Sequence, residues 1–359
     1  MILGGWPAGA AAAIGLARAG AEHLLIERTR ETGDPLCGGF LSWRTLDTLR
    51  ALGIDPDALN PASVTRVRLF AAGRMAEARL PRPAKAVSRH RLDSLLLARA
   101  EAEGARVERE VAAREVDGST VRLADGSAIA AGALFLASGK HDVRGQARPA
   151  EARGADPTLG LRVRLGPAAG LTRLVGDAIE LHLFDRGYAG LVLQEGGTAN
   201  LCMAVHRSRL GEAGSVEALL DALGREAPAL GERLAHKRGP VDAVANVPYG
   251  WRARDGRSGL FRLGDQAGVI PSLAGEGMSI ALASGARAAA AYVRSGPAAA
   301  AMFQQRLARD LARPLALAGA VRDFAERPAF ARPVLALARL APPLIQVVAR
   351  ATRIPQSAG

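Results

Sequence analysis

The segment ILGGWPAG at residues 2–9 decides the fold, together with the alanine-rich run at 10–19 and the short apolar run that ends at Glu27. The apolar pair before the glycines ends a strand, the glycines make a tight turn, and Gly20 stops the helix that follows. Glu27 closes the second strand, where a carboxylate can accept hydrogen bonds from a ribose diol. This order of strand, turn, helix and acidic strand end predicts a dinucleotide-binding unit.

The turn departs from the GxGxxG pattern in two ways. Trp6 occupies the position of the middle glycine, whose missing Cβ normally lets the backbone approach the phosphates. Only two apolar residues precede the turn, whereas a buried strand usually has about five, which leaves open a native start upstream of Met1. The helix N-terminus still favours a pyrophosphate. The cofactor contacts predicted in this unit are Gly4, Trp6, Pro7, Ala8, Gly9, Glu27 and Arg28.

A second segment, residues 260–285, combines a short strand, the pair Gly264-Asp265, a loop rich in proline and glycine, and a helix. A loop of this kind can hold a cofactor between a carboxylate and the start of a helix. The segment resembles flavoproteins of the p-hydroxybenzoate hydroxylase fold. The resemblance implies bound FAD, with Asp265 on the ribitol hydroxyls and the helix start facing the flavin ring. Its implied contacts are Gly264, Asp265, Pro271, Gly275, Glu276, Gly277 and Met278.

Two further segments are similar to the geranylgeranyl reductase branch of that fold: LCGGFLS at 36–42 and SRHRLD at 88–93. The resemblance implies that Arg89 contacts the flavin and that Cys37 and Gly38 lie beside it. Cys37 is therefore the candidate catalytic residue. The alternative is that it is a small buried hydrophobe, which is the usual state of a lone cysteine.

Residues 107–137 are expected to form a β-meander, with a strand over 107–116, two Asp-Gly turns, and a last strand that returns to the cofactor sheet. Ser138 and Gly139 follow that strand and are predicted cofactor contacts. Aromatic hydroxylases of the resembled fold usually have Asp-Gly at this point. The substitution of serine for aspartate counts against an aromatic hydroxylase.

The predicted fold class is α/β: a Rossmann-type FAD-binding domain, with a parallel sheet and β-meander, plus an inserted antiparallel-sheet substrate domain and C-terminal helices. Alternating apolar residues mark the inserted sheet. The predicted FAD-binding domain is discontinuous and covers 1–62, 87–154 and 253–296. The substrate domain covers 63–86 and 155–252, and the helical region covers 297–359.

Composition narrows the partners. Apolar residues make up 49% of the 359 residues and aromatic residues only 4%, and the excess of 47 Lys and Arg over 35 Asp and Glu is spread along the chain. Arginines scattered along the chain and few aromatic residues argue against a nucleic-acid partner. The two cysteines and six histidines lack the spacing of a disulfide framework or a metal site, which fits a cytoplasmic protein. The apolar and basic C-terminal helices either pack on the flavin domain, cap an apolar tunnel, or contact a membrane peripherally.

The function predicted from these features is that of an FAD-dependent oxidoreductase acting on a hydrophobic small molecule, polyketide-like or isoprenoid-like, by C=C reduction or dehydrogenation. A flavin monooxygenase that uses NAD(P)H and O2 is the alternative. A non-catalytic prenyl-chain carrier on the same fold is the alternative of another class, suggested by Trp6. Because no second GxGxxG follows a strand, NAD(P)H or another donor is expected to bind transiently in a shared cleft.

Overall fold

The computed structural model describes residues 1–340 and 343–354, so residues 341–342 and 355–359 of the predicted helical region lie outside the described residues. A parallel five-stranded sheet carries the N-terminal unit, in the order β16-β10-β1-β2-β6. Its first strand sits at the centre, with Ile2 and Leu3 fully buried. The strands are β1 (Ile2–Leu3), β2 (Leu24–Glu27), β6 (Arg106–Arg109), β10 (Leu134–Leu136) and β16 (Leu260–Arg262).

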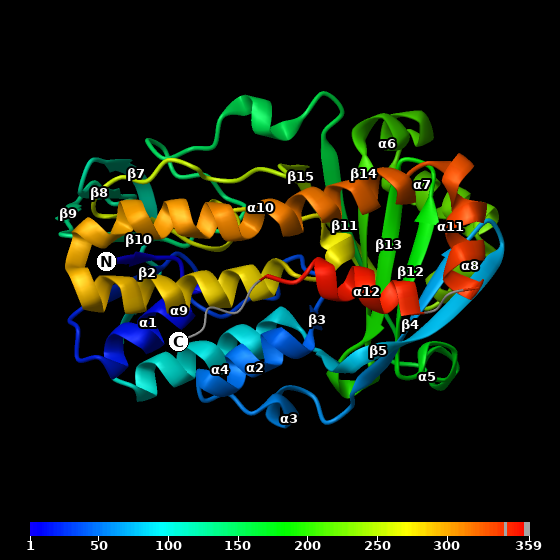
Figure 1. Ribbon diagram of the computed structural model, residues 1–359, viewed down its shortest axis with the longest axis horizontal. Coiled ribbons are helices and arrows are strands. Elements are labelled where there is room, and N and C mark those ends of the chain that lie inside the picture. The colour runs from blue at the N-terminus through cyan, green and yellow to red at the C-terminus, as the bar shows by residue number, and fades with distance from the viewer. Residues whose placement is uncertain (341–342, 355–359) are drawn as a thin grey trace.

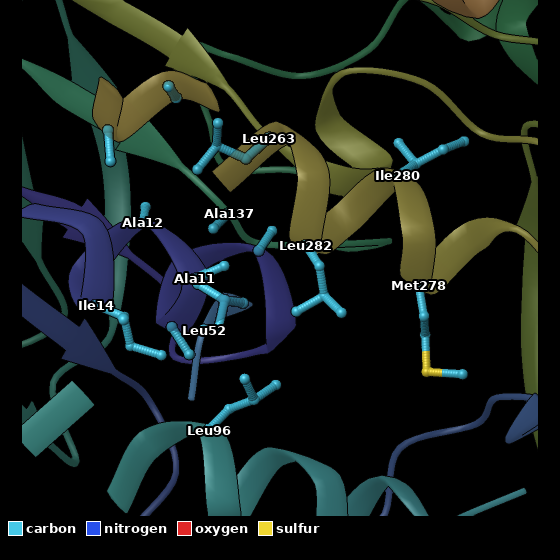
Figure 2. Close-up of a cluster of buried hydrophobic side chains, with 14 of the residues drawn as sticks. Ala11, Ala12, Ile14, Leu52, Leu96, Ala137, Leu263, Met278, Ile280 and Leu282 are labelled. Carbon is cyan, nitrogen blue, oxygen red and sulfur yellow. The ribbon is translucent and has the colours of Figure 1, made fainter. Parts of the chain in front are cut away.

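Helix α1 (Pro7–Arg18) is almost entirely buried because two other helices enclose it. Figure 2 shows Ala11 and Ala12 of α1 between Leu282 of α9 (Gly277–Ser295) and Leu96 of α4 (Arg89–Ala102). The helices approach so closely that a Cβ on Gly285 would lie 2.1 Å from the carbonyl oxygen of Ala8. The alanines that predict α1, together with Gly285 on α9, thus also permit the close packing of the two helices.

The second sheet has eight strands in the order β15-β11-β14-β13-β12-β4-β5-β3. It is antiparallel except that β12 pairs parallel with β4, in the register Ala178 with Arg66. The connection from β4 to β12 is about 100 residues long, which is ample for the crossover that a parallel pair needs. The strands are β3 (Phe40–Leu41), β4 (Val64–Ala71), β5 (Arg74–Ala86), β11 (Thr158–Leu165), β12 (Ala178–Phe184), β13 (Gly187–Leu193), β14 (Ala199–His206) and β15 (Lys237–Val247).

Helices cover both faces of the large sheet, as Figure 1 shows at the right of the molecule. Leucines of α5 (Ala169–Val175), α7 (Val216–Glu226) and α8 (Pro228–Leu234) form one hydrophobic cluster with the sheet. On the other face the end of α10 (Ala299–Ala325) and α11 (Pro328–Leu340) pack through Ala325, Leu335 and Ala338. The remaining helices are α2 (Trp43–Ala51), α3 (Pro56–Leu59), α6 (Arg207–Ala213) and α12 (Pro343–Ala351).

The expected strand over 107–116 is wrong as a single element. Its first part is β6, which extends the parallel sheet beside β2, and its second part is β7 (Ala113–Asp117), which starts a small meander with β8 (Thr120–Leu123) and β9 (Ala128–Ala130). Glu110, at φ 62°, turns the chain between the two parts. A left-handed residue cannot continue a strand, so the break follows from this one backbone conformation. Among the described residues, no helix is both long and apolar enough to cross a membrane.

Candidate functional site

One cavity of about 510 Å³ joins the N-terminal unit to the large sheet. Its walls are the turn after β1, the loop at 36–40, the start of α4, the loop at 272–278, one face of the large sheet, and helices α10, α11 and α12. Twelve of the predicted site residues line it. They are Trp6, Pro7, Ala8, Cys37, Gly38, Arg89, Gly139, Gly264, Asp265, Gly275, Gly277 and Met278.

The other predicted residues lie just outside the cavity lining and support its walls. Ser138 donates a hydrogen bond to the carbonyl of His141, 2.7 Å away, and so shapes the loop after β10. The guanidinium carbon of Arg28 lies 5.9 Å from the ring centre of Trp6. Pro271 is buried and precedes the loop at 272–278. The remaining four are Gly4, Gly9 and Glu27, at the turn after β1, and Glu276, at the start of α9.

Glu27 holds the first turn. Its buried carboxylate accepts hydrogen bonds from the backbone N–H of Gly5, at 2.8 Å, and from the N–H and hydroxyl of Thr29, at 3.1 and 2.9 Å. A charge-assisted bond to a backbone N–H is strong in a buried setting. The carboxylate therefore fixes the turn in front of α1.

The glycines of the turn are required by its shape. Gly4 has φ 102°, and a Cβ there would lie 2.7 Å from the carbonyl oxygen of Ala137 on the neighbouring strand end. A Cβ on Gly9 would lie 1.9 Å from the carbonyl oxygen of Gly4. Both positions exclude any side chain, so α1 starts directly above the strand, with its N-terminal N–H groups at the cavity.

Trp6 fills the place beside that helix start. Its indole lies over Gly139, makes an edge contact with His141 at a ring separation of 6.1 Å, and has the guanidinium carbon of Arg89 5.3 Å from its ring centre. Trp6 itself has ordinary extended backbone angles, φ −75° and ψ 178°. The backbone of the turn is therefore normal, and only the side chain departs from the dinucleotide pattern.

Arg89 begins α4 and is almost fully buried. It makes a two-pronged ion pair with Asp93, at 2.8 and 2.7 Å, one turn further along the helix. Burial opposes the charge, but the attraction of Asp93 outweighs it and holds the pKa of Arg89 above its usual value. The guanidinium is a permanent cation of the cavity wall, held rigidly by its partner.

The loop that carries Cys37 is tied to strand β14. The carbonyl of Cys37 accepts hydrogen bonds from the side-chain amide of Asn200, at 2.7 Å, and from the thiol of Cys202, at 3.0 Å. Burial raises the pKa of the Cys202 thiol to about 12, so it remains a neutral donor. Gly39 follows with φ 74° and lies against Gln194. Sequence reading missed Asn200 and Cys202, because only the folded sheet brings β14 to this loop.

Asp265 meets a second residue that the sequence did not single out. Lys140 Nζ lies 3.3 Å from Asp265 Oδ2, and both residues line the cavity. The charge of Asp265 raises the pKa of Lys140. The signal for Lys140 was present in the sequence, since it directly follows the predicted contacts Ser138 and Gly139. The cavity thus presents a lysine at the same place as the carboxylate expected to bind ribitol.

Glu276 is fully buried at the start of α9, and Arg353 lies against it from the far end of the chain. Arg353 Nη1 donates to Glu276 Oε1, at 2.6 Å, and to the carbonyl of Ala274, at 2.7 Å. Ser42 donates to the same carboxylate oxygen at 2.8 Å. Glu276 and Arg353 thus form a clamp that holds the loop at 272–277, and no local pattern around Arg353 indicates its part in it.

Three hydroxyl groups form the polar part of the cavity beside the same loop. The hydroxyl of Tyr188 lies 2.7 Å from Ser272 Oγ, and the hydroxyl of Tyr249 donates to that oxygen at 2.9 Å. Burial raises the pKa of Tyr188 well above its usual value, so its O–H stays protonated. Among the described residues, no three His, Cys, Asp or Glu side chains gather to hold a metal ion.

The residues fit an FAD in most respects. The cradle at Gly4 and Gly9 is one that any Cβ would fill, and Glu27, Arg89 and Asp265 surround the α1 N-terminus with the charges that a ribose, a diphosphate and a ribitol chain use. The one disagreement is Trp6, whose indole stands where the middle glycine of the pattern leaves space. The cavity can hold a flavin with an apolar molecule against it.

The family comparison agrees with this fit. Residues 1–144 match a protein-family model described as an FAD binding domain. No curated protein sequence is significantly similar to the chain. The N-terminal unit, with the turn, Glu27, Arg89 and Gly139, is therefore an FAD-binding domain, and FAD is its cofactor.

Solved structures place the whole chain in one fold. A geranylgeranyl bacteriochlorophyll reductase-like protein from Thermoplasma acidophilum is 18% identical, with a TM-score of 0.76 over 94% of this chain and 90% of that chain. PqsL of Pseudomonas aeruginosa, in complex with 2-aminobenzoylacetate, is 18% identical, with a TM-score of 0.71 over 92% and 97%. The flavin-dependent brominase Bmp2 is 16% identical, with a TM-score of 0.73 over 97% and 93%. The predicted α/β fold, with its parallel sheet and inserted second sheet, is confirmed.

Proposed function

We propose that this chain, an FAD-dependent oxidoreductase of the p-hydroxybenzoate hydroxylase fold, reduces or dehydrogenates a C=C bond of a hydrophobic small molecule. The molecule would be polyketide-like or isoprenoid-like. The reaction would exchange a hydride and a proton with the substrate, with NAD(P)H as the donor when a bond is reduced.

The observation that carries the proposal is the character of the cavity wall away from the flavin site. Most of the strand residues that face the cavity are aliphatic, and the described cavity-lining side chains of α10, α11 and α12 are apolar except Thr352 and Arg353, which follow α12. A site of this kind favours a ligand by the apolar area that it buries, at roughly 25 cal/mol per Å². The aliphatic residues of the sheet side are Val67, Leu69, Leu80, Ile179, Leu181, Leu183, Leu191, Val192, Val244 and Val247.

The residues at the flavin end have the chemistry that such a reaction needs. FAD, when bound, supplies the hydride exchange. Tyr249, whose O–H donates to Ser272, and Tyr188, whose O–H is kept protonated by burial, hold protons at the edge of the cavity. Asn200 and Cys202 hold the backbone of Cys37 at the same place. The apolar walls exclude water from the reacting atoms.

A flavin monooxygenase is the competing reaction on the same fold. The residues that favour C=C chemistry are Cys37, which lines the cavity, and Ser138, which stands where aromatic hydroxylases usually have aspartate. Ser138 uses its hydroxyl within its own loop, on the carbonyl of His141.

The fate of oxygen distinguishes the two reactions. The purified protein, loaded with FAD, would be given NAD(P)H and geranylgeraniol or 5-pentadecenylresorcinol as isoprenoid and polyketide probes, first without oxygen and then under ¹⁸O₂. We expect products that gain or lose two hydrogen atoms without oxygen, measured by mass spectrometry. Incorporation of one ¹⁸O atom and a strict need for oxygen would overturn C=C chemistry in favour of monooxygenation.

We also propose that the substrate reaches the cavity from an anionic lipid surface. Phe324 and Leu337 line the cavity and are nevertheless half exposed, at 50% and 55%, so they form its rim. Leu340 beside them is 86% exposed. Exposed Arg327, in the connection between α10 and α11, and exposed Arg339, on α11, lie close in sequence to these rim residues. Apolar side chains bordered by arginines are typical of a surface that enters the headgroup region of an anionic bilayer.

A further inference from the structure

The side chain of Trp6 lies in the path that joins the two ends of the FAD site. The guanidinium carbon of Arg28, which follows Glu27 at the position expected for the ribose, lies 5.9 Å from the ring centre. On the other side the indole lies over Gly139, which precedes Lys140, and Lys140 pairs with Asp265. The indole therefore stands between the carboxylate expected at the ribose and the carboxylate expected at the ribitol chain. A diphosphate connects those two parts of FAD.

The protein backbone gives no reason for a glycine at this position. Trp6 has extended backbone angles that any residue adopts, and it is the N-cap of α1, with its carbonyl accepting from the N–H of Ala10. In dinucleotide-binding turns, the middle glycine is needed because the diphosphate approaches the backbone there. The requirement comes from the ligand alone, so a tryptophan at this position acts on the ligand and leaves the fold intact.

The charges around the indole suit a diphosphate better than an aromatic ring. The guanidinium carbons of Arg28 and Arg89 lie 5.9 and 5.3 Å from the ring centre, α1 begins directly after Trp6, and Lys140 follows Gly139 in the chain. Cations and a helix start attract phosphate oxygens directly. The same cations hold the indole by cation–π attraction when it occupies this place. The indole and the diphosphate thus compete for one place and for the same cations.

We propose that Trp6 is a cofactor gate: FAD enters its site only when the indole turns away from Gly139, so the protein holds FAD as an exchangeable cofactor. This inference rests on the proposed function insofar as FAD is the ligand. The gate weakens FAD binding by the contacts that the indole loses on turning, two of them cation–π contacts. Contacts of this size correspond to about a tenfold change in the dissociation constant.

The test compares the FAD affinity of protein stripped of cofactor for wild type, Trp6→Gly and Trp6→Phe, by equilibrium dialysis. Trp251→Phe is the control, because that tryptophan lies outside the cavity lining and contacts Arg148. We expect Trp6→Gly to bind FAD about tenfold more tightly than wild type, with Trp6→Phe between the two and the control unchanged. Intrinsic tryptophan emission should change on FAD binding in wild type and in the control, and much less in Trp6→Phe.

Equal or weaker FAD binding by Trp6→Gly, in a variant that melts cooperatively, would overturn the gate. If Trp6→Gly does not fold, Trp6→Ala answers the same question, because it also empties the place of the indole. Failure of wild type and every folded variant to take up FAD would instead overturn the proposed function. If wild type binds FAD as tightly as Trp6→Gly does, only the gate is overturned and the proposed function stands.

Discussion

Trp6 and Gly139 are fitted to one another: a Cβ atom on Gly139 would lie 3.1 Å from Cζ3 and 3.2 Å from Cε3 of the indole. Gly139 also has φ 65°, a conformation in which a side chain is strained. The unusual residue in the first turn is therefore matched by a glycine about 130 residues later, in the loop that follows β10.

This pairing predicts that Gly139→Ala destabilises the protein by about 1–2 kcal/mol from backbone strain, with a further loss where the new methyl meets the indole. In the Trp6→Gly background the second part disappears. Urea unfolding of wild type, the two single variants and the double variant measures the coupling free energy between the two positions. We expect this coupling to be about 0.5–1 kcal/mol. Additive effects of the two substitutions would show that the ring and the glycine do not contact one another.

Removal of the Arg353 guanidinium should loosen the loop at 272–277. Arg353→Met leaves the carboxylate of Glu276 buried without its cation, and breaking a buried pair from one side costs about 3–5 kcal/mol. We expect a loss of this size in the free energy of unfolding and a weaker grip on FAD. The matched control is Arg350→Met on the exposed side of α12, which should change stability by no more than about 0.5 kcal/mol.

Filling the cavity at Gly190 should block apolar ligands without affecting the cofactor. A Cβ at Gly190 would lie 3.7 Å from Leu181 Cδ2, an ordinary contact, so a larger side chain can enter the cavity from β13. We expect Gly190→Leu to reduce binding of hexadecanol at least tenfold in calorimetry while FAD affinity stays that of wild type. Unchanged hexadecanol binding would place the apolar ligand somewhere else.

His206 should make stability depend on pH. Its Nε2 lies 2.9 Å from Glu326 and its Nδ1 lies 3.1 Å from Asp156, and the hydrogen bond to Glu326 raises its pKa, although Arg322 lies against the same ring. A histidine with a raised folded pKa contributes stability that is complete below about pH 6.5 and is lost as the pH rises through the folded value. The difference in unfolding free energy between wild type and His206→Gln should therefore shrink from pH 5.5 to pH 8.5.

The lipid surface proposed for the cavity rim is tested with vesicles. Wild type should sediment with vesicles of phosphatidylcholine and phosphatidylglycerol, and much less with phosphatidylcholine alone. Leu340→Asp should lose this binding while keeping the melting temperature and FAD affinity of wild type, because Leu340 is 86% exposed. Met302→Asp is the control, since Met302 is an exposed apolar residue at 52% on the opposite end of α10. Binding that survives Leu340→Asp would place the contact away from the rim.

Local patterns in the sequence were enough for the cofactor half of the fold. The turn at 2–9, the acidic end of β2 and the loop before α9 each have a short signature, and the structure gathers most of the residues predicted from them around one cavity. The break at Glu110 was missed because a single left-handed residue has no signature of its own in an acidic and basic stretch.

The rest of the site depends on contacts between distant segments. Lys140 meets Asp265, Asn200 meets Cys37, and Arg353 meets Glu276, each across more than 70 residues of chain. No periodicity or spacing reports such pairs, because they exist only once the two sheets and the C-terminal helices have come together.

The clamp between Arg353 and Glu276 also orders events during synthesis. A ribosome must make the chain beyond residue 353, and that part must leave the exit tunnel, before the buried carboxylate at the start of α9 receives its cation. The Rossmann-type unit can begin to fold from its first residues. The loop at 272–277 therefore becomes fixed only after Arg353 has left the exit tunnel, well after the Rossmann-type unit has been made.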